Sequence, residues 1–292
     1  YAAPATSIIL NRNCFGLTIG PGRMNELAKV RILPTYANIS IFNQTKTTRG
    51  NACPLNLVEM GHNTYELSGC IASGHSEISD AVAINNSRQA GTDILLGLLK
   101  KHNISIMGGV YYAVAPNNTT ILVEHDSDPL GKVITHMLKK SDDLVTDALY
   151  KKLASVYFNT TGTWANGKQA LSSILSAHTG IDFNQMIIVD GSGLSRNNQV
   201  SPAQLAALLN YAYQSMPNGS VFYEALPISG VDGTLRFRLG GDTQGRIHAK
   251  TGTMKNVSGL AGYVRTANNK SLTFAILVNA TNGNQGTYHM LQ

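Results

Sequence analysis

Two short polar motifs contain residue types that can perform acyl-transfer chemistry. The first is the run Lys-Thr-Gly-Thr at positions 250–253, at the end of an expected strand. The side chains of Lys250 and Thr251 can hold a substrate carboxylate, and Gly252 leaves room for an acyl substrate to lie against the strand. Taken alone, the tripeptide Lys-Thr-Gly is equally compatible with an ordinary strand end.

The second motif is Ser141-Asp142-Asp143, which lies between two expected helices. Because Ser and Asp are preferred helix caps, the triplet alone is compatible with a helix junction, which we expect at an exposed tip. Ser-x-x-Lys, Ser-Asp-Asn and Lys-Thr-Gly are, however, the three motifs of penicillin-binding proteins and active-site serine β-lactamases. The second and third occur here in the right order, with Asp143 in place of the usual Asn.

A third motif decides between these two groups of proteins. Residues 189–196 read Val-Asp-Gly-Ser-Gly-Leu-Ser-Arg, and Ser201-Pro202 follow at the start of an expected helix. With this run the chain resembles the low-molecular-mass class C penicillin-binding proteins, the periplasmic D-alanyl-D-alanine carboxypeptidase/endopeptidases. Further family-like segments are residues 11–15, 67–70, 137–142, 162–164 and 249–252. β-Lactamases share the short motifs but not these longer segments. The resemblance therefore covers nearly the whole chain.

The resemblance implies a role for each motif residue. In this family the serine of Ser-x-x-Lys attacks the D-Ala-D-Ala carbonyl and forms an acyl-enzyme, and penicillin acylates the same serine. Ser141 would belong to the proton-transfer chain, and position 143 would orient the substrate. Lys250 and Thr251 would bind the terminal carboxylate, and the backbone N–H of Thr253 would contribute to the oxyanion hole.

Arg196 also matches a family residue at the cleft. The resemblance implies that it helps to read a carboxylate of the stem peptide. A surface arginine on a glycine-rich turn is the alternative, and the sequence leaves both open.

The chain departs from the family pattern at two catalytic positions. No serine is followed three residues later by lysine, so we expect the nucleophile in a segment upstream of Tyr1. Asp143 exchanges an amide that donates and accepts hydrogen bonds for a carboxylate that only accepts. The sequence also ends soon after Val278, whereas relatives continue into a final helix.

Cysteine usage bears on the compartment. Cys53 and Cys70 flank two short alternating runs that predict a β-hairpin, whose outer ends a disulfide could join; two buried thiols are the alternative. A disulfide would imply an oxidising compartment, in agreement with the periplasmic or otherwise extracytoplasmic location of the bacterial family. Cys14 is left over, and its partner in relatives lies upstream.

Hydrophobic periodicity predicts an α+β fold. Strands are expected at 28–32, 39–42 and 81–84 and in the Cys53–Cys70 hairpin, with one helix around 94–99. Helices follow at 130–138, 144–153, 168–178 and 202–214, and strands then follow at 246–250, 260–264 and 272–278. We expect Asp128 to cap the first of these helices, with Pro129 at its first position. We interpret residues 1–125 as an inserted accessory region with a small β subdomain near 28–72. Residues 126–292 would be the C-terminal part of a split transpeptidase-like catalytic domain.

Composition excludes several other classes of protein. The 292 residues carry a net charge of +6, but the basic residues are scattered, so nucleic-acid binding has only net charge in its favour. The longest apolar run, Leu272 to Val278, is too short to span a bilayer. No Cys-x-x-Cys or His cluster predicts a metal site, and no cofactor is expected.

Two functional hypotheses remain. The first is a serine-type D-Ala-D-Ala carboxypeptidase/endopeptidase whose partners are peptidoglycan stem peptides and β-lactam antibiotics, residues 1–292 alone being inactive. The second is a catalytically impaired peptidoglycan-binding or interaction protein of the same fold, because two motif positions have changed. The oligomeric state is not indicated by the sequence.

Overall fold

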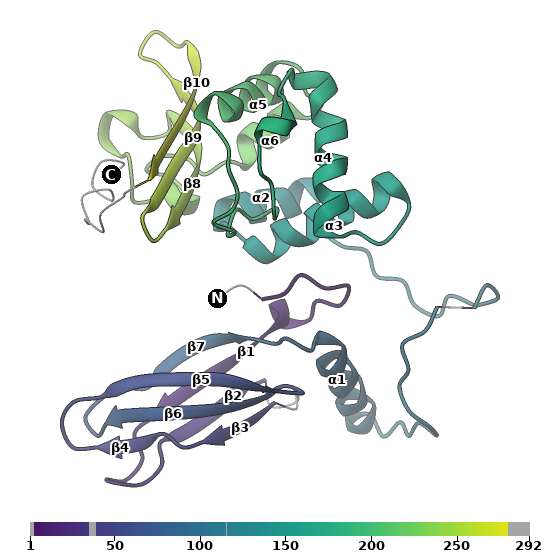
Figure 1. The fold of residues 1–292 in the computed structure, drawn as a ribbon, viewed down its shortest axis with the longest axis vertical. Helices are drawn as coiled ribbons and strands as arrows, with labels where there is room; N and C mark the ends of the chain where they lie inside the picture. The colour runs from purple at the N-terminus through teal and green to yellow at the C-terminus, as the bar shows by residue number, and fades with distance from the viewer. Residues whose placement is uncertain (1–2, 35–38, 115, 280–292) are drawn as a thin grey trace. The chain divides into compact units, whose positions relative to one another are not determined.

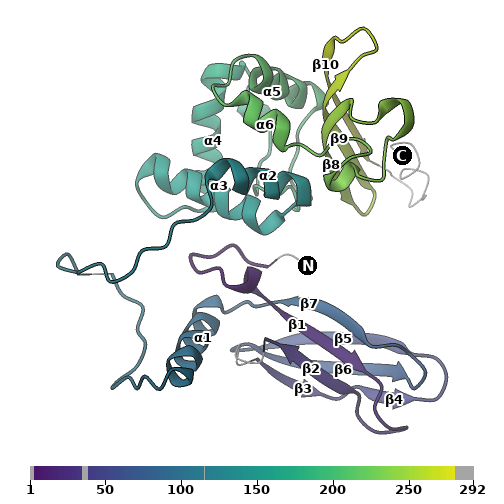
Figure 2. The ribbon, with the colours of Figure 1, turned by 180° about the vertical axis from the view of Figure 1, so that it is seen from behind.

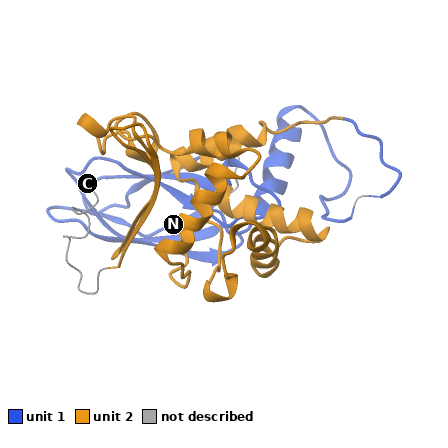
Figure 3. Cartoon of the chain, turned by 90° about the horizontal axis from the view of Figure 1, so that it is seen from above, with its two compact units in different colours: residues 1–122 blue, residues 123–292 orange. Residues whose placement is uncertain are grey.

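The computed structural model describes residues 3–34, 39–114 and 116–279. The chain divides into two compact units, residues 1–122 and 123–292, which Figure 3 shows in different colours. Each unit has its own core.

The first unit contains two β-sheets (Figure 1). In one, β1 (Cys14–Gly20) pairs antiparallel with β2 (Lys29–Leu33) and with β7 (Ile78–Ala83). In the other, β6 (Thr64–Ala72) pairs parallel with β3 (Ser40–Asn43) and β4 (Lys46–Thr48), and antiparallel with β5 (Cys53–Gly61). A 3₁₀ turn, η1 (Asn11–Asn13), precedes the strands, and α1 (Ser87–Lys101) follows them.

Alternate side chains of β1 and β6 form the core of this unit. The buried residues include Phe15, Leu17 and Ile19 from β1 and Tyr65, Leu67 and Ile71 from β6. The rings of Phe15 and Tyr65 lie 5.2 Å apart between their centroids, so the two sheets pack face to face. At the end of the β5–β6 hairpin, Cys53 and Cys70 are opposite each other and form a disulfide.

The second unit contains helices followed by an antiparallel sheet. The helices are α2 (Leu130–Lys140), α3 (Asp143–Phe158), α4 (Trp164–Thr179), α5 (Pro202–Gln214) and α6 (Gly219–Ala225). The strands are β8 (Ile247–Met254), β9 (Val257–Arg265) and β10 (Ser271–Asn279), in the order β10-β9-β8. Short 3₁₀ turns are η3 (Phe183–Gln185), η4 (Gly233–Leu235) and η5 (Gly241–Thr243).

The five helices lie on one side of this sheet (Figures 1 and 2). Tyr263 of β9 is buried with Leu209 of α5 and Leu226, and its hydroxyl donates to the carbonyl oxygen of Leu209 at 2.7 Å. The phenol therefore fills the interface without leaving an unpaired polar atom. The arrangement confirms the α+β prediction.

Two helix starts can be compared with the sequence prediction. The start of α5 agrees: Ser201 and Gln204 form a capping box, and Pro202 is the first helical residue. The predicted cap of α2 is wrong, because the N-cap is Pro129, whose carbonyl oxygen accepts the N–H of Lys132 at 2.8 Å. The Asp128 carboxylate instead lies 3.7 Å from the Lys132 ammonium. Within the described ranges, no helix is both long and apolar enough to cross a membrane.

Candidate active site

The Ser-Asp-Asp triplet forms the sharp junction between α2 and α3. Ser141 ends α2 in the left-handed conformation, with φ 54° and ψ 55°. Asp142 then caps α3 by accepting the backbone N–H of Val145 at 3.2 Å. The expected exposed tip is wrong, since Asp142 is only 3% exposed and Ser141 and Asp143 are half-buried. Burial of Asp142 is tolerated because its carboxylate accepts that amide and lies 3.4 Å from the ring of His136.

Lys250 of β8 reaches this junction. Its ammonium donates to the Ser141 hydroxyl at 2.6 Å and to the carbonyl oxygen of Thr251 at 2.7 Å. The first bond joins two motifs that are 109 residues apart in the sequence. A lysine in direct contact with a serine hydroxyl provides a short path for a proton.

Burial shifts the pKa values of two ionisable groups at the junction. Burial lowers the pKa of Lys250, an effect that the nearby Asp143 carboxylate partly offsets. Burial also raises the pKa of Asp143; Lys250 opposes that rise, and the carboxylates of Asp147, Asp142 and Asp190 add to it. Shifted pKa values of this kind are concentrated at catalytic sites, because they bring an acid or base closer to working pH.

The rest of the Lys-Thr-Gly-Thr run lies along a sheet edge. The segment before η4 covers the outer edge of β8 as far as Ala249. The N–H of Ala249 donates to the carbonyl oxygen of Pro227 at 2.9 Å. Beyond it, Gly252 and Thr253 are exposed, and a Cβ added to Gly252 would meet no atom within 4 Å. The strand end therefore has open space beside it in which an extended peptide could bind.

Two carboxylates hold the Asp-Gly-Ser-Gly-Leu-Ser-Arg loop. Asp190 accepts the backbone N–H groups of Gly193 at 2.8 Å and Ser195 at 2.6 Å. Asp147 of α3 accepts those of Gly191 at 3.0 Å and Ser192 at 2.8 Å. The loop is thus fixed in shape by its own first residue and attached to the helix that begins at the Ser-Asp-Asp triplet.

Gly191 permits this attachment because it packs directly against α3. A Cβ at position 191 would lie 2.7 Å from the Cβ of Tyr150 and 3.2 Å from the carbonyl oxygen of Thr146. A side chain larger than hydrogen would force the loop away from the helix.

Arg196, at the end of this loop, is exposed. Its guanidinium donates to the carbonyl oxygen of Lys255, in the turn between β8 and β9, at 3.0 Å. The structure therefore brings Ser141, Asp143 and Lys250 together and connects Arg196 to the turn that follows β8.

Two further residues, Thr234 and Asp147, contact motif residues although no sequence motif marks them. The hydroxyl of Thr251 donates to that of Thr234 at 2.8 Å. The pair Asp232-Gly233 is a turn signal that could have located this segment, but nothing local indicates that the turn meets β8.

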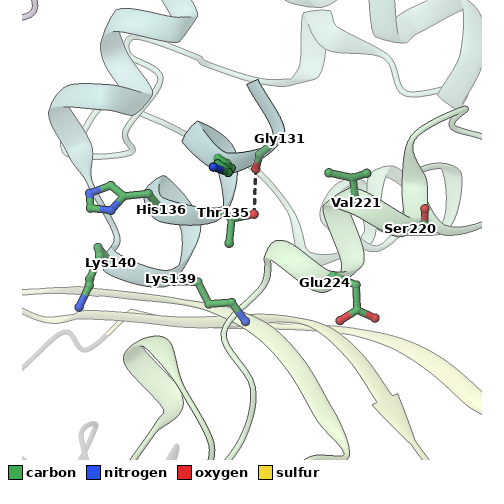
Figure 4. A pocket seen from close by; sticks show the side chains of 9 residues that line it. Gly131, Thr135, His136, Lys139, Lys140, Ser220, Val221 and Glu224 are labelled. Carbon is green, nitrogen blue, oxygen red and sulfur yellow. Dashed lines mark hydrogen bonds between the residues drawn. The ribbon is translucent and has the colours of Figure 1, made fainter. Parts of the chain in front are cut away.

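A separate cavity of about 630 Å³ lies between α2 and α6. Figure 4 shows its lining side chains, among them His136, Lys139, Lys140 and Glu224. None of the predicted site residues lines it, so it is distinct from the Ser141–Lys250 cluster. Among the residues that the structure describes, no group of three or more His, Cys, Asp or Glu side chains could hold a metal ion.

Comparison with known proteins identifies the family. The D-Ala-D-Ala carboxypeptidase 3 (S13) family profile matches residues 1–290. The chain belongs to the S13 family. Curated S13-like relatives include D-alanyl-D-alanine carboxypeptidase DacB of Haemophilus influenzae, 29% identical over 96% of this chain and 59% of that protein. The D-alanyl-D-alanine carboxypeptidase of Actinomadura sp. is 28% identical over 91% of this chain and 51% of that protein.

Solved structures agree with this S13 assignment. Penicillin-binding protein 4 of Haemophilus influenzae superimposes with a TM-score of 0.88 at 28% identity, over 97% of this chain and 64% of that one. Its complex with a β-lactam gives a TM-score of 0.86 at 29% identity, over 95% and 65%. The resemblance to penicillin-binding carboxypeptidases is confirmed. The chain spans 51–59% of the length of the two curated relatives.

Proposed function

We propose that the protein containing this chain is a serine-type D-Ala-D-Ala carboxypeptidase and DD-endopeptidase of peptidoglycan that penicillin acylates. The observation that carries the proposal is the 2.6 Å hydrogen bond from Lys250 to Ser141, beside the open edge of β8. Residues 126–292 are proposed as the C-terminal part of the catalytic domain, and residues 1–125 as an inserted accessory region. The nucleophilic serine belongs to a segment outside residues 1–292, because these contain no Ser-x-x-Lys.

The proposed reaction has two steps. The nucleophilic serine loses its hydroxyl proton as it attacks the carbonyl carbon of the D-Ala-D-Ala bond. The acyl–oxygen bond forms, the C–N bond breaks, and the amine of the terminal D-Ala leaves with a proton in return. Ser141, hydrogen-bonded to Lys250, passes that proton to the amine. Water then hydrolyses the acyl-enzyme, and in the endopeptidase reaction the leaving amine belongs to a cross-linked stem peptide.

The proposed substrate contacts lie along β8. Lys250 and Thr251 bind the terminal carboxylate, and the backbone N–H of Thr253 donates to the oxyanion that forms on the attacked carbonyl. Gly252 lets the substrate backbone approach the strand, in keeping with the open space beside it. Arg196 binds a further carboxylate of the stem peptide, since its exposed guanidinium is attached to the turn that follows β8.

Asp143 occupies the position that orients the substrate amide. An ionised carboxylate there accepts hydrogen bonds and repels a carbonyl oxygen, whereas a protonated one can also donate. Its raised pKa extends the protonated form to higher pH than an exposed aspartate would allow.

We also propose an extracytoplasmic location in a bacterium, where peptidoglycan stem peptides and β-lactams are the partners. The disulfide between Cys53 and Cys70 supports this proposal, because disulfides persist in oxidising compartments.

A second candidate is a peptidoglycan-binding protein of the same fold with impaired catalysis. The observation that favours it is Asp143, which places a carboxylate where the reaction calls for an amide. In this case the open edge of β8 would bind stem peptides without cleaving them.

The test that separates the two candidates is covalent labelling of the full-length protein with a fluorescent penicillin. The enzyme proposal expects a labelled band on a denaturing gel, abolished by prior treatment with unlabelled benzylpenicillin and strongly slowed by Lys250→Ala. Lys270→Ala, in the β9–β10 turn, is the matched control and should label like the wild type. An unlabelled wild-type protein that still binds a pentapeptide ending in D-Ala-D-Ala would establish the second candidate instead.

A further inference from the structure

We propose that Thr234 is a positioning residue for carboxylate recognition, acting through the hydroxyl of Thr251. The inference rests on the proposed function, in which Thr251 binds the terminal carboxylate of the substrate. It adds a residue that lies outside the three short motifs, on the turn η4 (Gly233–Leu235).

The hydroxyls of Thr234 and Thr251 form a direct pair. Their oxygen atoms are 2.8 Å apart, and both residues are half-buried. A hydroxyl both donates and accepts, and its hydrogen rotates to suit its partners. When a carboxylate binds, the Thr251 hydroxyl turns to donate to it and accepts the hydroxyl hydrogen of Thr234 in return. Each bond in such a chain strengthens the next, because donation from Thr234 polarises the Thr251 hydroxyl.

A partly buried ionic contact fixes the turn that carries Thr234. The ammonium of Lys139 lies 2.7 and 2.9 Å from the two carboxylate oxygens of Asp232 and donates to the carbonyl oxygen of Leu226 at 2.7 Å. The Lys139 side chain is 16% exposed, so solvent screens this contact less than a surface ion pair. The Asp232 carboxylate also accepts the N–H of Ile228 at 2.9 Å, which closes the turn on itself.

The position of Lys139 connects the turn to the Ser-Asp-Asp motif. Lys139 is in the last turn of α2, two residues before Ser141. Gly233 packs against the same helix end, since a Cβ there would lie 3.1 Å from the carbonyl oxygen of Lys139. The Lys139–Asp232 contact therefore holds Thr234 at a set distance from the residues that transfer the proton.

The turn is also attached to β8 on its other side. The N–H of Ser229 donates to the carbonyl oxygen of Ile247 at 2.9 Å, and the N–H of Ala249 donates to the carbonyl oxygen of Pro227 at 2.9 Å. Leu235, directly after Thr234, is fully buried and packs in one cluster with Ala249 and Leu260. With both neighbours of Thr234 fixed, its hydroxyl has little freedom except rotation of its hydrogen.

The test compares two β-lactams that differ in one charge. Acylation rates of the full-length protein are measured with benzylpenicillin and with its methyl ester, which lacks the carboxylate. Thr234→Val keeps the side-chain shape and removes the hydroxyl, so it should slow acylation by benzylpenicillin about five- to tenfold, the usual effect of one hydrogen bond. Acylation by the methyl ester should stay within about twofold, because the hydroxyl chain has no carboxylate to bind.

Three controls distinguish positioning from a general structural effect. Thr234→Ser retains the hydroxyl and should restore the benzylpenicillin rate. Thr273 lies on β10, at the other edge of the sheet, and its hydroxyl donates to the side chain of Asn210. Thr273→Val removes this hydroxyl and should change neither acylation rate. In a Thr251→Val background, Thr234→Val should cause no further loss, because residues that act through one another are not additive.

Several results would overturn the inference. Equal slowing with both β-lactams, an unchanged benzylpenicillin rate, or an additive loss in the Thr251→Val background would each show that Thr234 does not act through Thr251. A Thr234→Val protein that melts well below the wild type would be replaced by Thr234→Ala, judged by the same ratio of the two rates. Failure of the wild-type protein to react with either β-lactam would instead overturn the proposed function, and this inference with it.

Discussion

The ammonium of Lys250 lies 2.6 Å from the hydroxyl of Ser141, although 109 residues separate them in the sequence. The contact forms because the left-handed turn at Ser141 ends α2 beside β8. Since burial lowers the pKa of Lys250, a proton on its ammonium is released more easily than from an exposed lysine. We propose this pair as the proton path of the site; the neighbouring Asp143 carboxylate partly offsets the lowered pKa of Lys250.

Replacing Asp143 by Asn should speed acylation by benzylpenicillin roughly tenfold at neutral pH, because an amide both donates and accepts where the carboxylate only accepts. In the wild type the rate should rise as pH falls through the pKa of Asp143, which burial raises. The Asp143→Asn protein should lack that rise. Stopped-flow acylation rates from pH 4 to 8 would check both expectations, and a slower variant at neutral pH would show that the site is adapted to the carboxylate.

The same substitution should raise stability at neutral pH. The folded-state pKa of Asp143 lies above its ordinary value, so the folded protein favours the protonated form. The stability contributed by this group is therefore fully present below the unfolded pKa and is lost as pH rises through the folded pKa. As the pH rises from the unfolded to the folded pKa of Asp143, the melting temperature of the wild type should fall relative to that of Asp143→Asn. Parallel curves would contradict the assignment.

Gly191→Ala should destabilise the second unit by about 2 kcal/mol, since overpacking a closely packed contact costs 1–3 kcal/mol. The added methyl group would meet the Cβ of Tyr150 and the carbonyl oxygen of Thr146. Gly180→Ala is a useful comparison, because Gly180 has open space around it and a positive φ, so it tests strain without a clash. Differential scanning calorimetry would compare the two, and an unchanged melting temperature for Gly191→Ala would refute the close contact.

Lys139→Met should lower the free energy of unfolding by about 2 kcal/mol, because it leaves the Asp232 carboxylate without its charged partner. The loss is smaller than for a fully buried pair, since the Asp232 side chain is 39% exposed. The paired variant Lys139→Met/Asp232→Asn should recover part of the stability. Urea titration of each variant measures these changes; if the double variant were no more stable than Lys139→Met, the unpaired carboxylate would not be the cause.

Removing the disulfide should lower the free energy of unfolding of the first unit by about 3 kcal/mol. A cross-link that closes a loop of this length restricts the conformational entropy of the unfolded chain by about that amount. Cys53 and Cys70 are 17 residues apart. Cys53→Ser/Cys70→Ser should therefore melt at a lower temperature than the oxidised protein and no longer respond to reductant. Mass spectrometry of the unreduced wild type should show the two peptides linked, and two free thiols there would remove the support for an oxidising compartment.

The sequence predicted the elements whose signals are local. The Ser201-Pro202 helix start and the alternation of β9 and β10 located those elements closely, because caps and periodicity are properties of a few neighbouring residues. Strand β8 was also predicted, but it runs on to Met254 instead of ending at Lys250. Strand β1 was missed, since Gly16 and Gly20 lower the strand propensity of a segment that tertiary packing nevertheless places at the centre of a sheet.

The candidate site was predictable only in part. The motif residues could be named from the resemblance to the family motifs, but the Thr251–Thr234 and Gly191–Asp147 contacts depend on how distant segments pack. Burial of Asp142 was also beyond local reasoning, because the triplet Ser-Asp-Asp has the composition of an exposed turn. Contacts of this kind become visible only when the helix junction and the sheet edge are placed side by side.

The most direct test of the central claim is release of D-Ala from a pentapeptide ending in D-Ala-D-Ala. The full-length wild-type protein should release free D-Ala, and Ser141→Ala should lower the rate by about 10²- to 10⁴-fold, as expected for loss of a proton-transfer group. The Ser141→Ala protein should keep the melting temperature of the wild type and still bind the peptide. Release at the wild-type rate by Ser141→Ala, or no release by the wild type, would contradict the account of the Ser141–Lys250 pair as a proton path.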